Sequence, residues 1–475
     1  MVKTMPILNR ITDTLAKALR VFGKDTRAGM ATMVAVGAIP LIGFSGLAVD
    51  STRGYMLRSQ LVYALDSAGL AGGKELFSNQ LDVTVDRFFA ANFPDGYMGS
   101  TVSGPTFTVD DAAETLTVTA SATIPTTFMQ VLGVEDMTVS ATTVVQRSIR
   151  GMELALVMDN TGSMRSGNKM TTMKASAMEL IGILYGDQQA IDDFFVSLVP
   201  YSVTVNVGAG RTNWLDGTYD PTAYEDVGTE WKGCVEARAT PLDLDDTPPN
   251  GGFWSAFFYP TDTDNIYPVV DESNNAQNDG TGPNLGCGPA ITSLTPARST
   301  IEAGIQEMQP WHRGGTMGNL GLAWGWRVLS PQWRGLWGGD TPSTMPLDYD
   351  EPLMDKVVVM LTDGNNQWYD HPPAGPDGSD YGSYGRRGWG VLGTTGASAA
   401  LAEVNNRMAA TCELMKAEGI KIFTITFQVS SSSTRALYEN CATSPDFYFN
   451  SPTNEDLTQT FRAIGTELSN LRIAQ

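Results

Sequence analysis

The sequence predicts an α/β fold in which a mostly parallel sheet carries helices on both faces, preceded by an apolar helix and a small α+β region. Three observations predict it. Short apolar strands alternate with amphipathic helical segments over residues 150–475, which is typical of parallel sheets with two covered faces. Two of these strands end in an aspartate and a glycine-containing turn, at Asp159 and Asp363. Residues 28–49 carry no charge at all.

Composition limits the classes of function. The chain has 475 residues, a formal net charge of -21 and a pI near 4.4. Nucleic acid is an unsuitable partner, because its phosphates require a basic surface. The length suggests two or three domains. Positive charge is concentrated in residues 1–27, which hold six basic and two acidic residues, so the remainder is still more acidic.

The uncharged segment 28–49 is long enough, at 22 residues, to cross a bilayer as a helix. We predict a transmembrane helix here, with the basic segment 1–27 in the cytoplasm and the rest of the chain on the other side. A cleavable signal peptide is the competing interpretation. The long basic segment and the length of the apolar run favour the membrane helix.

Residues 50–99 are predicted to form a helical stalk, because apolar residues recur at helical spacing between Asp50 and Phe77. This helix either packs within its own domain or lies against partner membrane helices, and the sequence leaves both open. Residues 100–149 alternate apolar and polar side chains and are rich in threonine, as half-buried strands are. With one short helix expected at 125–132, they predict a small α+β spacer.

The region from Arg27 to about residue 76 resembles the amino-terminal part of TadG-like proteins of the bacterial Flp (tight adherence) pilus assembly system. In that family an acidic residue follows the membrane helix, then Arg and Tyr, then a pattern of Leu, Ala and Asp. The matching positions here are Asp50, Arg53, Tyr55, Leu61, Ala64, Asp66, Ala68, Leu70 and Ala71. A processed prepilin would need Glu five residues after the glycine at which it is cleaved. Five residues after Gly29 this chain has Val34, so we expect the helix to be retained.

This resemblance implies a location and a setting. The protein would be a single-pass protein of the bacterial inner membrane, with a cytoplasmic amino terminus and most of the chain in the periplasm. Its partners would be components of pilus assembly or of the envelope.

The region 150–475 reads as alternating helices and strands with three insertions. Helices are predicted at 169–184, 301–308, 320–329, 398–417, 434–440 and 455–471, and strands at 153–158, 194–207, 355–362, 420–427 and 446–450, with 194–207 forming either one strand or two. The insertions, at about 209–296, 331–354 and 365–395, are rich in Gly, Pro, Trp and Tyr. For any single tryptophan in them we favour loop packing over a role as an interface anchor.

A set of oxygen donors gathers at the strand ends. Asp159, Thr161 and Ser163 follow the first strand in one short loop. Thr316 precedes a helix, and Asp363 ends a later strand. Carboxylate and hydroxyl oxygens suit Mg²⁺ or Mn²⁺, with Ca²⁺ a less suitable ion. Taken alone, the first loop could equally be an ordinary polar turn.

Together the five residues resemble the metal-ion-dependent adhesion site of von Willebrand factor A domains, whose pattern is D-x-[ST]-x-S, then T, then D. Every position is filled, with Thr161 where Ser is commoner. The resemblance implies a Rossmann-like A domain over 150–475 and a bound ion. It also implies a protein partner that offers a carboxylate to the ion.

Four cysteines allow three pairings, and an oxidising compartment outside the cytoplasm would favour disulfides. We favour Cys234 with Cys287, closing the large insertion, and Cys412 with Cys441, although the sequence does not fix the pairing. The spacings are not those of a zinc site or a redox dithiol.

Other motifs carry little weight. The glycines from Gly388 match G-x-G-x-x-G but follow no strand, and Asp262-Thr-Asp-Asn lacks the glycine of a calcium loop. His312 and His371 have no nucleophile motif beside them. The chain is therefore predicted not to be an enzyme.

The leading hypothesis is a membrane-anchored, metal-dependent protein-binding module in Flp pilus assembly, anchoring or adhesion. The alternative is a structural envelope protein whose ion only joins the loops and whose aromatic insertions bind partners. A metal-assisted enzyme is the least favoured, because it lacks a general base beyond the two carboxylates assigned to the ion.

Overall fold

The computed structural model describes residues 28–74, 80–110, 115–146, 151–217, 220, 229–266, 280–311, 313–370 and 375–472. The predicted basic segment 1–27 and both histidines lie outside these residues. The chain divides into two compact units, Met1–Ser148 and Ile149–Gln475, called here the amino-terminal and carboxy-terminal units.

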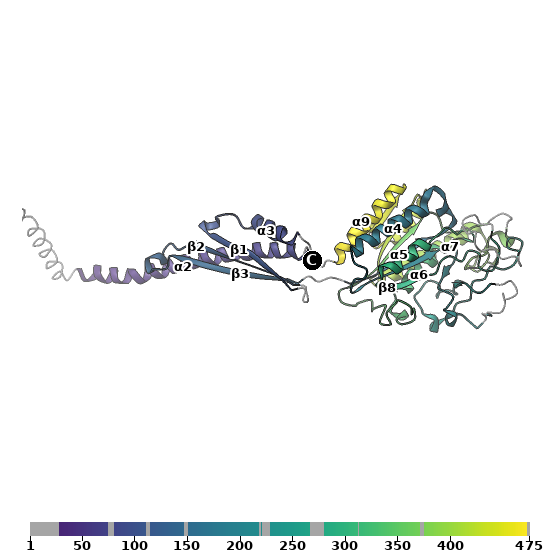
Figure 1. Ribbon diagram of the computed structural model, residues 1–475, viewed down its shortest axis with the longest axis horizontal. Helices are drawn as coiled ribbons and strands as arrows, with labels where there is room; N and C mark the ends of the chain where they lie inside the picture. The colour runs from purple at the N-terminus through teal and green to yellow at the C-terminus, as the bar shows by residue number, and fades with distance from the viewer. Residues whose placement is uncertain are drawn as a thin grey trace, which may run out of the picture. The chain divides into compact units, whose positions relative to one another are not determined.

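Within the described residues, the amino-terminal unit contains helices packed on an antiparallel sheet (Figure 1). Its elements are α2 (Ala28–Lys74), α3 (Leu81–Asn92), β1 (Thr101–Asp110), β2 (Thr115–Pro125), the short 3-10 helix η2 (Met129–Leu132) and β3 (Asp136–Gln146). The strand order is β1-β2-β3. Alternate residues of β2 are buried, as its period-two pattern predicts.

Helix α2 has two different halves. Its first half is exposed and apolar, with Met33, Ile39 and Phe44 each at least 70% exposed. Its second half is amphipathic, and Leu57 and Leu61 are fully buried against the sheet and α3. Within the described residues one helix is long and apolar enough to cross a membrane, over Met33–Gly73, with a mean hydropathy of 1.8.

Asp50 marks the change between the halves of α2. Its carboxylate is 1% exposed and accepts hydrogen bonds from the backbone N–H groups of Thr127, Phe128 and Met129, at 2.8–2.9 Å. Arg53, one turn later, donates to the carbonyl of Pro125. Two residues of the family pattern therefore attach the helix to the turn before β3.

The predicted stalk (50–99) and spacer (100–149) share one hydrophobic core. This core contains Leu61 and Leu65 of α2, Phe89 of α3 and Val118 of β2. Of the two arrangements left open for the helix, packing within its own unit is the one observed for this face. The stripe that includes Tyr55 and Leu70 stays exposed, at 74% and 58%.

The carboxy-terminal unit is built on an eight-stranded sheet, and the predicted α/β class is confirmed. The sheet order is β13-β12-β10-β4-β5-β6-β7, with β8 also beside β5. The strands from β13 to β5 are parallel, whereas β6, β7 and β8 are antiparallel additions. Their bounds are β4 (Gly151–Asp159), β5 (Phe194–Tyr201), β6 (Val205–Asn206), β7 (Cys234–Val235), β8 (Thr292–Thr295), β10 (Met354–Thr362), β12 (Lys421–Phe427) and β13 (Tyr448–Ser451).

Helices cover both faces of this sheet. On one face α4 (Lys169–Tyr185), α5 (Arg298–Glu307) and α9 (Asn454–Arg472) pack on alternate residues of β4 such as Leu154 and Leu156. On the other, α6 (Gly318–Arg327), α7 (Ala397–Ala417) and α8 (Ser432–Cys441) pack on Ala155 and Val157. Every residue of β4 and β10 is buried, as expected for strands covered on both faces. The buried charges of Glu153 in β4 and Lys356 in β10 form an ion pair.

The insertions supply a second layer of core. Their tryptophans form a cluster against α6, with ring centroids 5.1 Å apart for Trp214 and Trp333 and 5.4 Å apart for Trp333 and Trp337. Trp254 and Trp324 complete it. Loop packing is therefore the role of these side chains, whereas Trp389 of the last insertion is 52% exposed.

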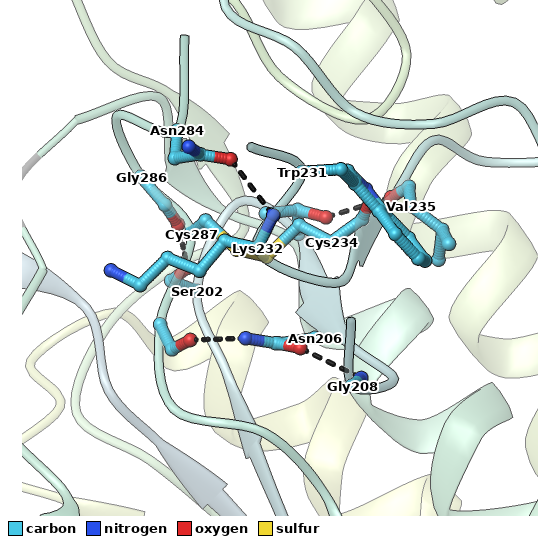
Figure 2. The surroundings of a disulfide bond; sticks show 12 residues. Ser202, Asn206, Gly208, Trp231, Lys232, Cys234, Val235, Asn284, Gly286 and Cys287 are labelled. Carbon is cyan, nitrogen blue, oxygen red and sulfur yellow. Dashed lines mark hydrogen bonds between the residues drawn. A yellow bond between two sulfur atoms is a disulfide. The ribbon is translucent and has the colours of Figure 1, made fainter. Parts of the chain in front are cut away.

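Two disulfides fasten the unit, in the pairing favoured from the sequence. Cys234 is bonded to Cys287 within the large insertion, and Cys412 of α7 to Cys441 of α8. Figure 2 shows the first bridge with Asn284 beside it, whose side chain accepts a hydrogen bond from the Lys232 N–H at 3.1 Å. The 3-10 turn at Arg387–Trp389 accounts for the glycine-rich motif as a loop.

Removing the Cys412–Cys441 bridge should destabilise the carboxy-terminal unit by about 3 kcal/mol, because the bridge closes a loop of 29 residues and so restricts the unfolded chain. All 10 tryptophans lie in this unit, so urea unfolding of the full-length C412S/C441S chain in detergent can be followed by tryptophan fluorescence. A loss below about 1 kcal/mol would contradict the chain-entropy argument.

Candidate metal centre

The two predicted carboxylates lie at one edge of the sheet because their strands are neighbours. β4 and β10 run parallel in register, with Met158 opposite Leu361. Asp159 is the last residue of β4, and Asp363 directly follows β10. Both are buried, at 0% and 5% exposure. The carboxyl edge of a parallel sheet is where ligand sites of α/β folds are found.

Asp159 is held from three directions. Its Oδ1 accepts a hydrogen bond from the Thr161 N–H at 2.8 Å, and its Oδ2 one from the Thr362 hydroxyl at 2.9 Å. The Asp363 N–H and the Tyr201 hydroxyl lie farther from Oδ2, at 3.3 and 3.4 Å. Burial, followed by the charge of Asp363, raises the pKa of Asp159 to about 6, against the opposing effect of the hydrogen bonds.

The two hydroxyls of the first loop connect the carboxylates. The Thr161 and Ser163 hydroxyl oxygens are 3.0 Å apart, and the Ser163 hydroxyl donates to Asp363 Oδ1 at 2.5 Å. The other oxygen, Oδ2, accepts from the ammonium of Lys169 at 2.9 Å. Four of the five predicted residues therefore form one hydrogen-bonded set. Lys169, the first residue of α4, joins that set without having been predicted.

Thr316 reaches the same place from a third loop. The short strand β9 (Gly315–Thr316) pairs with β11 (Gln367–Trp368), which follows the Asp363 turn. Both loops line an open hollow of about 290 Å³ together with the first loop. The lining residues are Thr161, Gly162, Ser163, Arg165, Ser166, Gly315, Thr316, Gln367 and Tyr369.

Gly315 permits this close pairing. Its φ is +109°, a region that side chains rarely adopt, and an added Cβ would lie 2.1 Å from the Gln367 carbonyl oxygen. Thr316 is therefore presented by a backbone turn that only glycine fits.

Buried charges support the same loop from behind. Arg313 contacts Asp380 and Asp264, at 3.0 Å each, and Asp380 also accepts the Gly314 N–H at 3.0 Å. Arg386 pairs with the other oxygen of Asp264 at 2.7 Å. This accounts for the calcium-like Asp262-Thr-Asp-Asn stretch as a structural turn, because both oxygens of Asp264 are used by arginines.

The main chain also joins the two sides of the hollow. Trp311 donates its N–H to the Asn160 carbonyl at 2.7 Å and is bridged to Thr161. The Met317 N–H donates to the Ser202 carbonyl at 3.0 Å, directly after β5. The loops carrying Thr161 and Thr316 are therefore fixed to one another by backbone.

The donor set suits a hard divalent cation. It consists of two carboxylates and three hydroxyls, without sulfur, and hydroxyl and carboxylate oxygens are the donors that Mg²⁺ and Mn²⁺ accept. Across the described ranges, no group of three or more His, Cys, Asp or Glu side chains is placed to hold a metal. A site here would thus depend on hydroxyls as much as on charge. Asp159, Thr161, Ser163 and Asp363 are in contact, and Thr316 lines the same hollow as Thr161 and Ser163.

Sequence reasoning did not find Lys169, Tyr201 or Thr362. Thr362 is the residue before Asp363, and its hydroxyl could have been recognised as a further oxygen donor at that strand end. Lys169 begins a helix and Tyr201 ends β5, and only the fold brings them to the carboxylates.

Comparison with known families finds a match in the amino-terminal region. Residues 29–75 match the family model described as putative Flp pilus-assembly TadE/G-like, which confirms the resemblance noted for that region. No curated protein matches the sequence.

Several solved structures are similar to this chain at low identity. The pilus adhesin SpaC from Lactobacillus rhamnosus GG is 11% identical, with 81% of this chain and 36% of SpaC covered and a TM-score of 0.36. The vWF domain of the type V pili tip protein Mfa5 from Porphyromonas gingivalis is 10% identical, with 69% of this chain and 97% of that domain covered and a TM-score of 0.37. The chain thus spans about a third of the length of SpaC.

A third structure is that of proximal thread matrix protein 1 from the mussel byssus, with a zinc-occupied MIDAS motif. It is 14% identical, with 67% of this chain and 48% of the mussel protein covered, and the TM-score is 0.31.

The raised pKa of Asp159 predicts a pH effect on the metal-free protein. Because folding favours the protonated carboxyl, its contribution to stability is complete below the unfolded value of 3.8 and is lost as the pH rises through about 6. In EDTA, lowering the pH from 8 should therefore stabilise the wild type, by roughly 3 kcal/mol in all from this group. D159N should lack this component and be the more stable protein at pH 8.

The measurement is urea unfolding by tryptophan fluorescence at several pH values, comparing wild type, D159N and D355N. Asp355 lies at the other end of β10, beside Lys421 at 3.0 Å, so D355N controls for loss of a carboxylate in the same strand. Parallel pH profiles of wild type and D159N would show that Asp159 ionises normally.

Substitution of Gly315 should disturb the Thr316 loop. G315A places a Cβ 2.1 Å from a backbone oxygen at a positive φ, so we expect a loss of about 2–3 kcal/mol in the free energy of unfolding. Gly364 has open space around its Cβ position, which makes G364A the matched control. Equal stability of the two variants by urea unfolding would refute the close approach.

Proposed function

We propose that this protein is a membrane-anchored, metal-dependent protein-binding module that acts in Flp pilus assembly, anchoring or adhesion. The observation that carries the proposal is the open hollow at the sheet edge, where two buried carboxylates underlie the hydroxyls of Thr161, Ser163 and Thr316. This is a donor set for an ion, placed where a partner can reach it.

The chemistry of such a site follows from its few negative charges. Thr161, Ser163 and Thr316 would hold Mg²⁺ or Mn²⁺ through neutral hydroxyls, with Asp159 and Asp363 behind them. An ion with so little anionic ligation remains electrophilic, and its preference for six oxygen ligands favours an additional carboxylate. We infer that the carboxylate comes from an Asp or Glu side chain of a partner protein. The open hollow gives that side chain access.

The amino-terminal unit would supply the attachment. The exposed apolar half of α2 spans 28–49, and the matched family region overlaps it. We propose that this half lies in the bacterial inner membrane as a single span, with residues 1–27 in the cytoplasm and the carboxy-terminal unit in the periplasm. Two disulfides in that unit suit an oxidising compartment.

The alternative, a structural protein that binds through aromatic insertions, has less support. Most of the tryptophans of the insertions are inside the cluster on α6, and among the described insertion residues the large aromatic side chains that stay exposed are Phe253, Tyr369 and Trp389. Catalysis is also disfavoured, because the two carboxylates at the site are the groups proposed to hold the ion and each already accepts several hydrogen bonds.

The decisive test is metal binding by the full-length chain in detergent, measured by calorimetry with Mn²⁺ and Mg²⁺. D159A should abolish binding, and T316A should weaken it about tenfold, since one neutral ligand is lost. D355A, which removes a carboxylate from the opposite end of β10, should bind as wild type does. Tryptophan fluorescence verifies that each variant is folded.

A pull-down from envelope extract, with and without metal, distinguishes the metal-dependent binding module from the structural alternative. A partner retained only with metal, and lost in T316A, supports a carboxylate that completes the ion. Metal binding combined with a partner that is retained equally in EDTA would instead support an ion that only joins the loops. Absence of metal binding in the folded wild type would refute the proposal.

A further inference from the structure

Lys169 is the one cation in direct contact with the carboxylates of the candidate centre, as the described residues show it. Its ammonium lies 2.9 Å from Asp363 Oδ2, and the two side chains are only 12% and 0% exposed. The contact is between a helix residue and a strand-end residue 194 positions later in the chain. It is therefore a product of the fold and not of the local loop.

With the ammonium of Lys169, both oxygens of Asp363 have a hydrogen-bond donor without any metal ion. Ser163 donates to one oxygen of this carboxylate and Lys169 to the other. Asp159 is likewise satisfied, by Thr161 and Thr362. The centre can thus stand preformed in the absence of an ion, although it holds two buried carboxylates side by side.

The charges at the centre then add up simply. The charged groups in mutual contact, two carboxylates and one ammonium, leave a net charge of −1, so a divalent ion would bring their total to +1; Arg165, which lines the hollow, adds positive charge beside them. One carboxylate from a partner would return it to zero. Without the ammonium, the ion alone would already neutralise the site. Lys169 therefore leaves one positive charge unbalanced for the ligand.

We propose that Lys169 sets the charge of the metal centre, weakening the hold on the ion alone and making a monoanionic carboxylate the ligand that completes it. The inference rests on the proposed metal-binding function and specifies how it is controlled. Lys169 does not ligate the ion. It shares Asp363 with the ion and repels it, so metal and partner carboxylate bind with positive cooperativity.

Removing the charge of Lys169 should lower the stability of the metal-free protein but raise the affinity of the protein for a metal ion. In EDTA, K169M should be less stable than wild type, because Asp363 loses its counter-ion. With metal, K169M should bind Mn²⁺ on the order of tenfold more tightly, because a repulsive charge near the ion is gone. If the role of Lys169 were merely structural, K169M would lower both the stability in EDTA and the affinity for Mn²⁺.

The experiment measures Mn²⁺ affinity by calorimetry for full-length wild type, K169M, K169Q and K169R, with and without acetate as the carboxylate probe. K169Q keeps a hydrogen-bond donor without charge and should behave like K169M, whereas K169R should behave like wild type. Acetate should raise the Mn²⁺ affinity of wild type and K169R more than that of the uncharged variants. K174M is the matched control on the same helix, since Lys174 binds the carbonyls of Gln306 and Met308 instead.

The outcomes distinguish the inference from the function. Unchanged or weaker Mn²⁺ affinity in folded K169M and K169Q, with binding in wild type, overturns the inference alone. Binding by K169M but not by wild type would support Lys169 as the competitor and overturn the function proposed for the native chain. Absence of binding in all folded proteins overturns both. If K169M fails to fold in EDTA, K169Q and K169R still decide between charge and packing.

Discussion

The side-by-side burial of Asp159 and Asp363 is the constraint around which the rest of the carboxy-terminal unit is arranged. Two carboxylates at the ends of neighbouring strands repel one another and are costly to bury. The surrounding structure answers with hydroxyl and backbone donors on every side, and with one ammonium. The cost of burying two carboxylates side by side is the reason for proposing a cation site here.

The insertions serve that site mainly as supports. A cluster of tryptophans packs them on α6, and a disulfide closes the largest one. The buried Arg313 and its two aspartates fix the loop that carries Thr316. Buried ion pairs contribute little to stability as such, since desolvation offsets much of the attraction. Their use here is geometric, because each arginine fixes the direction of a loop that has no regular structure.

The amino-terminal unit solves a different problem with similar means. One continuous helix carries an exposed apolar half and a second half that packs on a sheet. Asp50 stands at this change and binds three consecutive N–H groups of the turn before β3. A buried carboxylate with three backbone donors is well satisfied, so it can end the apolar half without weakening the core that begins at Leu57.

The sequence by itself determined the fold class, the apolar helix, the main strands and helices in their chain order, and the candidate oxygen donors, but not the short strands β7 and β8 inside the large insertion. Hydrophobic period and strand-end aspartates are local signals, and these were sufficient. The sequence also favoured the cysteine pairing, which the structure shows. It separated stalk from spacer, however, because a shared core between α2, α3 and β2 leaves no local sign. Only the tertiary structure brought Lys169, Tyr201 and the Arg313 network to the carboxyl edge of the sheet. Contacts between residues far apart in the sequence depend on how strands and helices pack and not on local pattern.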